Sequence, residues 1–304
     1  MLFEAYAMLL AQKLPIEQAR KFLRISHTSL SAIVRHYVDK NVAADDLSSV
    51  SAICVDETSL KRGQSYVTVV GDSVNRRVID VENGRGAEQV VEFSLKLEEK
   101  GGNCNKIMCA TSDMSSAYLS AIQACFPKAT RIIDKFHVSK LMRQAMNKVR
   151  HEEQGKLSKR KKAGRKLLML PENNMTEEQR ARANEICKQY PHTGRAFRMV
   201  QAFDTFYRSR DLNEAQEQFG KLISWLKRSR LKPMKHVAKT LVMHKDAILA
   251  YFLTRLTNAM AEGMNSLIQA GKRKARGFKT FKGYSTMIYL TCSKINFAPI
   301  PLFP

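Results

Sequence analysis

An apolar run that ends in an aspartate, Ile53-Cys54-Val55-Asp56, decides the fold predicted for this chain. A second such run, residues 107–111, is followed by Asp113. Short apolar runs bounded by turn residues indicate buried strands, and the active groups of open α/β sheets lie at strand ends. A third acid, Glu262, lies far downstream in a stretch that reads as helix. Two strand-end aspartates and a helical glutamate can form a carboxylate cage for two magnesium ions, the arrangement that cuts and joins phosphodiesters.

The elements expected after residue 50 follow the order β-β-β-α-β-α-β-α. The β-branched and apolar patterns predict strands at residues 51–56, 65–71, 77–81, 106–111 and 130–133. Helices are expected at residues 87–99, in the segment before Pro127, and from about residue 136 to 149. This order is that of a ribonuclease-H-like fold, an α/β fold with a mixed five-stranded sheet whose first strand lies beside the fourth. We therefore expect Asp56 and Asp113 to lie together.

Magnesium prefers oxygen ligands, and two ions can clamp the attacking and leaving oxygens of an in-line displacement. One carboxylate has to bridge both ions, and we assign this role to Asp56. Asp113 would hold one ion and Glu262 the other, with Mn²⁺ as a substitute ion. Each residue also has a plainer interpretation: Asp113 precedes a helix and can cap it, and a lone helical glutamate is usually a surface residue.

Other acidic residues near the strand ends are weaker candidates. Glu57 adjoins Asp56, but neighbours on a strand point to opposite faces, so a loop or surface role is expected. Asp134 follows the fifth strand and can either orient His137 or serve as an ordinary structural aspartate. Neither Asp134 nor His137 is predicted to bind metal.

The charge of the chain favours a polyanionic partner. Its 304 residues include 51 basic and 28 acidic residues, a net charge of +23. Residues 151–250 hold 22 basic and 11 acidic residues; residues 251–304 hold 8 basic residues and one acid, Glu262. A lone carboxylate in so basic a region is consistent with phosphates and metal gathering there. Double-stranded DNA is the partner this predicts, against the alternative of a merely soluble basic surface.

No apolar run approaches the ~18 residues of a membrane span, and the first residues lack the basic region of a signal peptide, so no membrane association is expected. The six cysteines are scattered, without a CxxC pair. This argues against a zinc site and predicts a reducing, cytoplasmic location.

The first fifty residues are predicted to form a helix-turn-helix and a linker. Helices are expected at residues 2–14 and 15–23, and a third helix would be capped by Thr28 or Ser29. A helix, a short turn and a helix with a polar start is the geometry that sets a helix in the major groove, where Thr28, Ser29 and Arg35 would face DNA. A plain three-helix packing unit fits the same pattern. Residues 41–51 are small and polar, as in a linker.

Residues 151–250 are expected to form an all-helical basic insertion, with helices at 176–190, 193–208, 212–228 and 233–251. The predicted organisation is therefore a DNA-binding region at 1–50, a first core part at 51–150, the insertion at 151–250, and a core return at 251–304. The return carries the glutamate helix and then a basic run that can follow a DNA backbone. The basic residues of this run are Lys272, Arg273, Lys274 and Arg276.

The chain resembles the ISL-three group of insertion-sequence transposases, in the DDE superfamily. The matching stretches are Val55–Thr58 with Tyr66–Val70, Ser112–Met114 with Tyr118, Phe126–Ala129 with Asp134–Val138, and Asn258–Asn265 with Lys272, Arg273, Gly277 and Phe278. The resemblance implies that Asp56, Asp113 and Glu262 are the catalytic triad, and that the helix-turn-helix helps to bind the element ends.

The sequence departs from the pattern of this family in three places. The family usually carries a cysteine zinc module before the helix-turn-helix, and no such module occurs here. Ala259 stands where a glycine is common, and Gln269 where a lysine is usual. None of these differences removes a predicted metal ligand.

The function predicted from the sequence is that of a DNA transposase. Water would cleave a strand at the element end with the help of two Mg²⁺ ions, and the freed 3′ hydroxyl would attack target DNA. We expect a nucleoid-associated protein of the bacterial cytoplasm that forms a homo-oligomer on DNA. Two alternatives remain: a nuclease of the same fold that cuts without joining, and a DNA-binding protein with a dead core.

Overall fold

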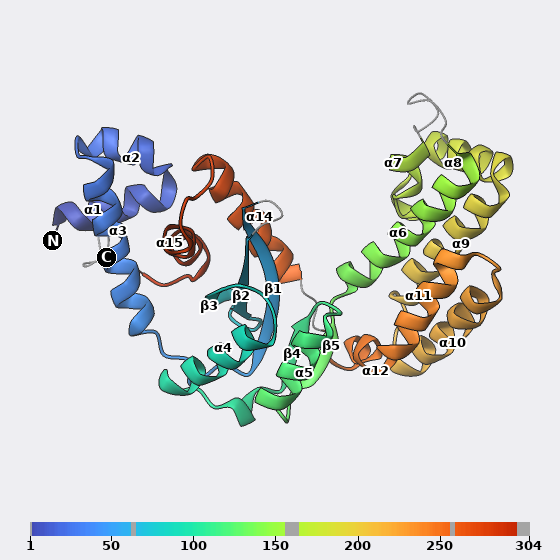
Figure 1. The fold of residues 1–304 in the computed structure, drawn as a ribbon, viewed down its shortest axis with the longest axis horizontal. Helices are drawn as coiled ribbons and strands as arrows, with labels where there is room; N and C mark the ends of the chain where they lie inside the picture. Colours follow the sequence, from blue (N-terminus) through green and yellow to red (C-terminus); the bar gives the residue numbers. More distant parts are fainter. Residues whose placement is uncertain (1, 62–64, 156–163, 256–258, 297–304) are drawn as a thin grey trace. The chain divides into compact units, whose positions relative to one another are not determined.

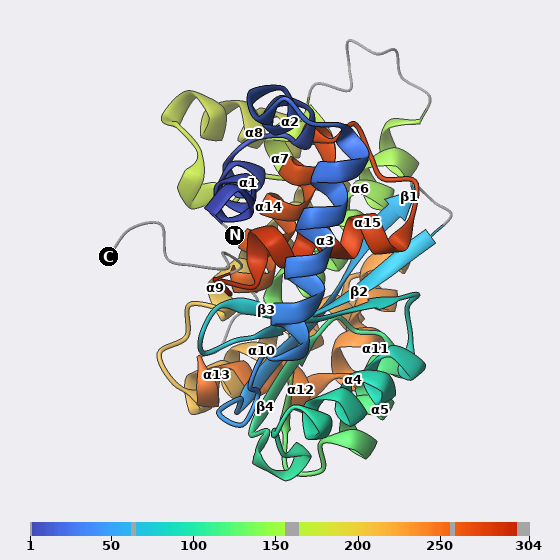
Figure 2. The same cartoon turned by 90° about the vertical axis from the view of Figure 1, so that its left-hand side faces the viewer.

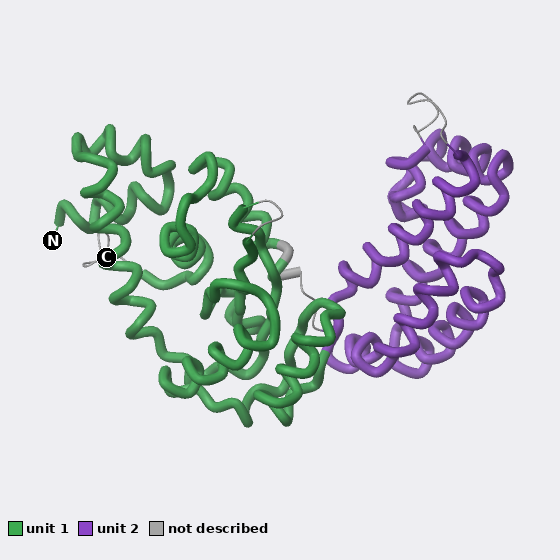
Figure 3. The backbone as a smooth tube through the Cα atoms, in the orientation of Figure 1, with its two compact units in different colours: residues 1–131, 257–304 green, residues 132–256 purple. Residues whose placement is uncertain are grey.

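The computed structural model describes residues 2–61, 65–155, 164–255 and 259–296 (Figure 1). The side chains at positions 259, 260 and 262 are also outside the described part. The chain forms two compact units (Figure 3). Unit 1 comprises residues 1–131 and 257–304, and unit 2 comprises residues 132–256.

Unit 1 begins with three helices, α1 (Leu2–Lys13), α2 (Ile16–Leu23) and α3 (His27–Ala43). Pro15 occupies the N-cap of α2, and Arg24 ends that helix in the left-handed conformation, with φ 53°. The expected cap of α3 was wrong: Ser26 is the cap, and its Oγ accepts a hydrogen bond from the Ser29 amide at 2.9 Å. Thr28 and Ser29 therefore lie in the first turn of α3, because the extended Ser26 starts the helix earlier than expected.

The sheet of unit 1 has five strands in the order β3-β2-β1-β4-β5. The strands are β1 (Ala52–Lys61), β2 (Ser65–Asp72), β3 (Arg77–Asn83), β4 (Cys109–Ser112) and β5 (Thr130–Ile133). Strand β2 pairs antiparallel with both β1 and β3, whereas β1 pairs parallel with β4. The predicted mixed α/β sheet, with the first strand beside the fourth, is confirmed.

Two strand boundaries differ from the prediction by three residues or more. The loop expected after Asp56 was wrong for residues 57–61, because β1 continues to Lys61 in a long antiparallel pairing with β2 that ends at Ser65. Strand β4 begins three residues later than expected, because a 3-10 turn at Cys104–Lys106 precedes it. Asp56 therefore lies inside β1 and not at its end.

Helices cover both faces of this sheet (Figure 2). Ile53 and Val55 belong to one apolar cluster, together with residues of α4 (Ala87–Glu99) and α5 (Ser116–Cys125). Cys54 belongs to a second cluster, with residues of α14 (Ala259–Lys274) and α15 (Phe281–Cys292). The alternation of neighbouring β1 side chains between two apolar clusters is what a strand in the middle of a three-layer unit requires.

The N-terminal helices pack against α15. Leu290 of α15 shares an apolar cluster with α1, α2 and α3. Lys282 Nζ binds Asp39 Oδ1 of α3 at 2.7 Å. Arg77 at the start of β3 pairs with Asp45, just after α3, at 2.7 Å. The three helices are thus attached to the sheet of unit 1 through both charged and apolar contacts.

After the last two residues of β5, every described element of unit 2 is a helix. Its helices are α6 (Lys135–Gln154), α7 (Gly164–Leu168), α8 (Glu177–Gln189), α9 (Pro191–Phe206), α10 (Leu212–Arg228), α11 (Lys232–Met243), α12 (Lys245–Leu249) and α13 (Tyr251–Thr254). The single helix expected at 233–251 is divided among α11, α12 and α13. Phe206 lies in an aromatic core, with ring centroids 5.7 Å from Phe219 and 5.1 Å from Phe252. The division at residues 132 and 256 places all of α6 in unit 2.

Candidate active site

The parallel pairing of β1 with β4 brings Asp56 and Asp113 to the same end of this two-stranded ladder. Strand β1 pairs with β4 at Ala52↔Cys109, Ile53↔Ala110 and Cys54↔Thr111. Continuing this register by two residues places Asp113 opposite Asp56. Both aspartates therefore lie where the parallel ladder between β1 and β4 ends, the edge at which open α/β sheets place their active groups.

Backbone amides orient both carboxylates. Asp56 Oδ1 accepts a hydrogen bond from the Glu57 amide, and Asp113 Oδ1 accepts one from the Ser115 amide, each at 2.8 Å. Ser115 is the N-cap residue of α5, so Asp113 is not the cap that its plainer interpretation supposed, although it accepts a hydrogen bond from the amide of the cap residue. This contact uses one oxygen of a half-buried carboxylate and is compatible with metal binding by the same side chain.

Helix α14 lies along β1 through three side-chain contacts. Asn265 Nδ2 donates to Asp56 Oδ2 at 2.6 Å, and Gln269 Nε2 donates to Thr58 Oγ1 at 2.9 Å. Lys272 Nζ donates to the carbonyl oxygen of Ser59, also at 2.6 Å. The three α14 residues are spaced by four and three positions, so they share one face of the helix. This face is held against the strand that carries Asp56.

The side chain of Glu262 lies outside the described residues. Its backbone position belongs to α14, one helical turn before Asn265. Residues three apart lie on one side of a helix, so position 262 is on the side of α14 that meets Asp56.

A second polar group lies on the other face of β1. Glu57 pairs with Thr68 of β2, and the Thr68 hydroxyl is 3.0 Å from the hydroxyl of Tyr118 on α5. Burial raises the pKa of Glu57, a hydrogen bond with Tyr118 opposes this rise, and the negative charge of Asp113 adds to it. Glu57 is therefore a half-buried strand residue and not the loop or surface residue that was expected; the strand alternation did predict that it points away from Asp56.

Two residues of this site were missed by the sequence reasoning. Asn265 and Tyr118 both occur in the stretches that carry the family resemblance, but no role was assigned to them. For Asn265 a signal was present, since its spacing from Glu262 places both on one helical face. For Tyr118 the only signal was an aromatic residue at core spacing, which does not reveal a polar contact.

The residues predicted to bind DNA have different surroundings. Thr28, Ser29 and Arg35 are exposed on α3, and the Ser29 hydroxyl lies 2.8 Å from that of Ser26. Lys272 is half-buried, with its ammonium also 5.9 Å from the ring centroid of Tyr284. The other three basic residues of this run are exposed: Arg273, Lys274 and Arg276.

Asp134 has a local structural role in unit 2. It caps α6 by accepting a hydrogen bond from the Phe136 amide at 3.1 Å. His137 Nε2 lies 3.8 Å from its other carboxylate oxygen. The described contacts of Asp134 are thus those of a helix cap that also orients a histidine.

The oxygen ligands near Asp56 suit a hard divalent cation. Asp56 and Asp113 supply carboxylate oxygens, which are the ligands that Mg²⁺ prefers. The described residues contain no group of three or more His, Cys, Asp and Glu side chains placed to hold a metal ion. Position 262, whose side chain is not described, is where the sequence predicts the third carboxylate.

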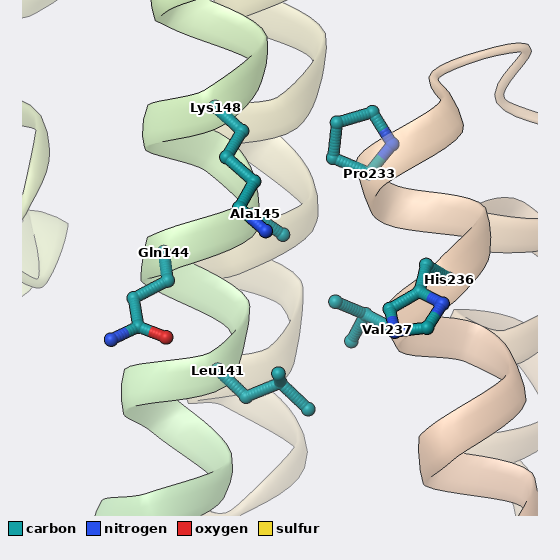
Figure 4. Close-up of a pocket in the computed structure, with 7 residues that line it drawn as sticks. All are labelled: Leu141, Gln144, Ala145, Lys148, Pro233, His236 and Val237. Carbon is teal, nitrogen blue, oxygen red and sulfur yellow. The ribbon is translucent and has the colours of Figure 1, made fainter.

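A separate hollow of about 190 Å³ lies between α6 and α11 of unit 2 (Figure 4). Its walls include Leu141, Ala145, Pro233 and Val237, with Lys148 and His236 beside them. These linings contain no carboxylate, so this hollow has no part in the predicted metal site. Among the described helices, none combines the length and the apolar character that crossing a membrane requires.

Comparison with known proteins agrees with the fold and with the family that the sequence resembles. A model of the ISL3 group of DDE transposases matches residues 53–288. The chain is also similar to the transposase for insertion sequence element IS1001 of Bordetella parapertussis, with 24% identity over 277 residues, covering 89% of this chain and 68% of the relative. The transposase for insertion sequence element IS1557 of Mycobacterium tuberculosis is 23% identical over 299 residues, with coverage of 89% and 67%.

The chain belongs to the ISL3 family of DDE transposases, because the family match spans most of its length. The resemblance found in the sequence is thereby confirmed. Membership makes the protein an insertion-sequence transposase, a polynucleotidyl transferase type of enzyme whose substrate is DNA.

Proposed function

We propose that the protein cleaves DNA strands at the ends of an insertion sequence and joins the freed 3′ hydroxyls to target DNA, using Asp56, Asp113 and Glu262. The observation that carries this proposal is the parallel register of β1 and β4, with the Asn265–Asp56 hydrogen bond beside it. These features support the proposal, because the ladder of β1 and β4 ends beside two carboxylates and Asn265 lies one turn after position 262 on α14.

The side chains of unit 1 would hold and orient the metal ligands. Asp56 would bridge two Mg²⁺ ions, Asp113 would hold one, and Glu262 the other; Mn²⁺ would serve in their place. When bound, such ions stabilise charge on the attacking and leaving oxygens of the phosphodiester. Asn265 and the Glu57 amide each bind one oxygen of Asp56, so this carboxylate is held in one orientation before any ligand binds.

The charge distribution supports DNA as the partner of both units. Residues 132–256 contain 28 basic and 12 acidic residues. Such an excess supplies the sequence-independent part of DNA binding through release of counterions from the phosphates. In unit 1 we assign sequence recognition to α3, with Thr28, Ser29 and Arg35 facing the groove. Arg273, Lys274 and Arg276 would contact the backbone, and the active species would be a homo-oligomer on the element ends.

The central test replaces each predicted ligand by its uncharged counterpart. Asp56→Asn, Asp113→Asn and Glu262→Gln should each slow cleavage of a labelled element-end duplex in Mg²⁺ by about a thousandfold, because metal stabilisation of the transition state is worth several kcal/mol. Binding of the same duplex in Ca²⁺ should change little. Glu92→Gln, which neutralises an exposed carboxylate on α4, is the matched control and should cleave normally. Cleavage at the control rate by any ligand variant would refute that assignment.

A strand-transfer assay separates transposition from nuclease activity. Duplexes with a free 3′ hydroxyl at the element end should be joined to plasmid DNA by the unmodified protein in Mg²⁺ or Mn²⁺. Cleavage without joining would identify a nuclease of the same fold. Equal DNA binding with EDTA and with Mg²⁺, accompanied by no cleavage, would identify a DNA-binding protein with an inactive core.

A further inference from the structure

A short loop between β3 and α4, Gly84-Arg85-Gly86, has a backbone that suits glycine on both sides of one arginine. Gly84 has φ +106° and Gly86 has φ +135°, a region that L side chains rarely adopt. A Cβ added at Gly84 would also lie 3.0 Å from the Gln89 side-chain nitrogen. The two glycines thus allow the backbone conformation that positions the side chain of Arg85.

Side chains of α4 and β2 bind the backbone at the start of this loop. Gln89 Nε2 of α4 donates to the Asn83 carbonyl at 3.2 Å, and Thr68 Oγ1 of β2 donates to the Gly84 carbonyl at 3.0 Å. The Thr68 hydroxyl in turn contacts Tyr118 of α5. Burial raises the pKa of Tyr118, so its hydroxyl keeps its proton and remains a hydrogen-bond donor.

The side chain of Arg85 is exposed although the loop is fastened. Its guanidinium carbon lies 4.2 Å from the ring centroid of Tyr66, which supports the planar group without neutralising it. In the described part of the chain, no carboxylate lies within ion-pair distance of Arg85. Its hydrogen-bond donors therefore have no described anionic acceptor.

The loop follows β3 at the end of the sheet where the parallel ladder of β1 and β4 ends at the aspartates. Strand β3 ends at Asn83, which pairs with Val67, and Val67 pairs with Thr58 of β1. Strands β1 and β3 run in the same direction because both are antiparallel to β2. Arg85 thus extends beyond the same end of the sheet as the residues that follow Asp56.

We propose that Arg85 is a positioning residue that binds a phosphate of the DNA strand being processed, next to the phosphodiester held at Asp56 and Asp113. This inference rests on the proposed function. A guanidinium offers parallel N–H donors whose geometry matches phosphate oxygens, and its support by Tyr66 reduces the ordering that binding requires. The ligand class is a phosphodiester backbone, contacted without reading the base sequence.

The test compares Arg85 with an arginine at the opposite end of the same sheet. Arg76 is exposed in the turn between β2 and β3, so Arg76→Ala removes the same charge far from the aspartates. Binding of a fluorescent element-end duplex is measured in Ca²⁺ at several NaCl concentrations for the unmodified protein, Arg85→Ala, Arg85→Lys and Arg76→Ala. Melting temperatures verify that each variant is folded.

Arg85→Ala should weaken DNA binding about tenfold, as expected for a hydrogen-bonded charge pair, and reduce the slope of log K against log salt by about 0.9. Arg85→Lys should keep the slope, because the charge remains, and recover part of the affinity. Arg76→Ala should leave both quantities near those of the unmodified protein. Equal affinity and slope for Arg85→Ala and Arg76→Ala, or a lower melting temperature without a change in slope, would overturn the inference.

The same proteins separate this inference from the proposed function. If the unmodified protein fails to cleave in Mg²⁺ or Mn²⁺, the proposed function fails, while the salt slopes still decide whether Arg85 contacts a phosphate. If the unmodified protein cleaves and Arg85→Ala cleaves with unchanged KM and kcat, the role of Arg85 fails while the proposed function stands.

Discussion

Replacement of Asn265 should measure how firmly α14 is held at Asp56. Asn265→Leu keeps a similar shape but removes the donor that binds Asp56 Oδ2 at 2.6 Å. A hydrogen bond to a charged group contributes about 1.5–3 kcal/mol. We take about 2 kcal/mol, because both residues are half-buried. For a unit of this size, each kcal/mol changes the melting temperature by about 2–4 °C, so unit 1 should melt about 6 °C lower.

Asn265→Asp makes a sharper perturbation, since it removes the same donor and adds a carboxylate. Two unit charges 4 Å apart repel by about 4 kcal/mol at an effective dielectric constant of 20. Solvent around these half-buried groups should reduce that cost to about 2 kcal/mol. Together with the lost hydrogen bond, the loss of stability is about 4 kcal/mol, so the melting temperature of unit 1 in EDTA should decrease by about 12 °C. Added Mg²⁺ should recover much of this loss, because a divalent cation turns adjacent carboxylates from a repulsive pair into ligands.

The assay is thermal unfolding of the whole chain in EDTA and in Mg²⁺, followed by a probe placed in unit 1. Gln269→Leu is the matched control: it removes a donor from the same face of α14, but its partner is the neutral Thr58 hydroxyl. Its loss should be about 1 kcal/mol and insensitive to Mg²⁺. Two results would show that Asn265 does not adjoin a metal-binding carboxylate. In the first, Asn265→Asp melts no lower in EDTA than Asn265→Leu. In the second, Mg²⁺ raises the melting temperature of neither variant by more than it raises that of Gln269→Leu.

Three further predictions concern single side chains. Burial and the charge of Asp80 raise the pKa of Glu82 from 4.5 to about 8, against the opposing hydrogen bond from Lys96. The contribution of Glu82 to the free energy of unfolding should therefore be complete below pH 4.5 and decrease as the pH rises to about 8, and Glu82→Gln should remove this contribution in urea titrations. Lys272→Met should slow cleavage and leave the salt dependence of DNA binding unchanged, because its ammonium binds a β1 carbonyl, whereas Arg273→Ala should reduce the salt slope. Tyr207→Phe should increase the free energy of unfolding of unit 2 by about 1 kcal/mol, because the described residues give the buried Tyr207 hydroxyl no hydrogen-bond partner. A higher melting temperature of unit 2 would show this gain.

The order of strands was predictable because apolar runs and turn residues are local signals. The run ending at Asp56 and the β-branched segment after residue 65 gave the right elements, and the α/β order gave the right neighbours. The end of β1 was not predictable in the same way. Residues 57–61 have no apolar alternation of their own, and they are extended because β2 pairs with them.

The contacts that orient the site were less accessible to sequence reasoning. Asn265 and Asp56 are 209 residues apart, so no periodicity within either element shows that they bind each other. The helical spacing of 265, 269 and 272 does predict a shared face, but several α14 faces contain polar residues. Arg85 had a clearer signal, since a glycine on each side of one residue indicates a backbone that other residues would strain.

The described contacts also indicate how a site can include a glutamate that follows a long insertion. In sequence, unit 2 separates Asp113 from α14. Because the insertion is long, the position of α14 along β1 has to be fixed by contacts of the helix itself. Three side chains of α14 make these contacts, and all their partners belong to β1. Asn265 binds Asp56, Gln269 binds the Thr58 hydroxyl, and Lys272 binds the Ser59 carbonyl. The position of α14 on β1 is therefore specified by contacts within unit 1. It follows that changes in the helices of unit 2 should alter DNA binding before they alter the predicted carboxylate site.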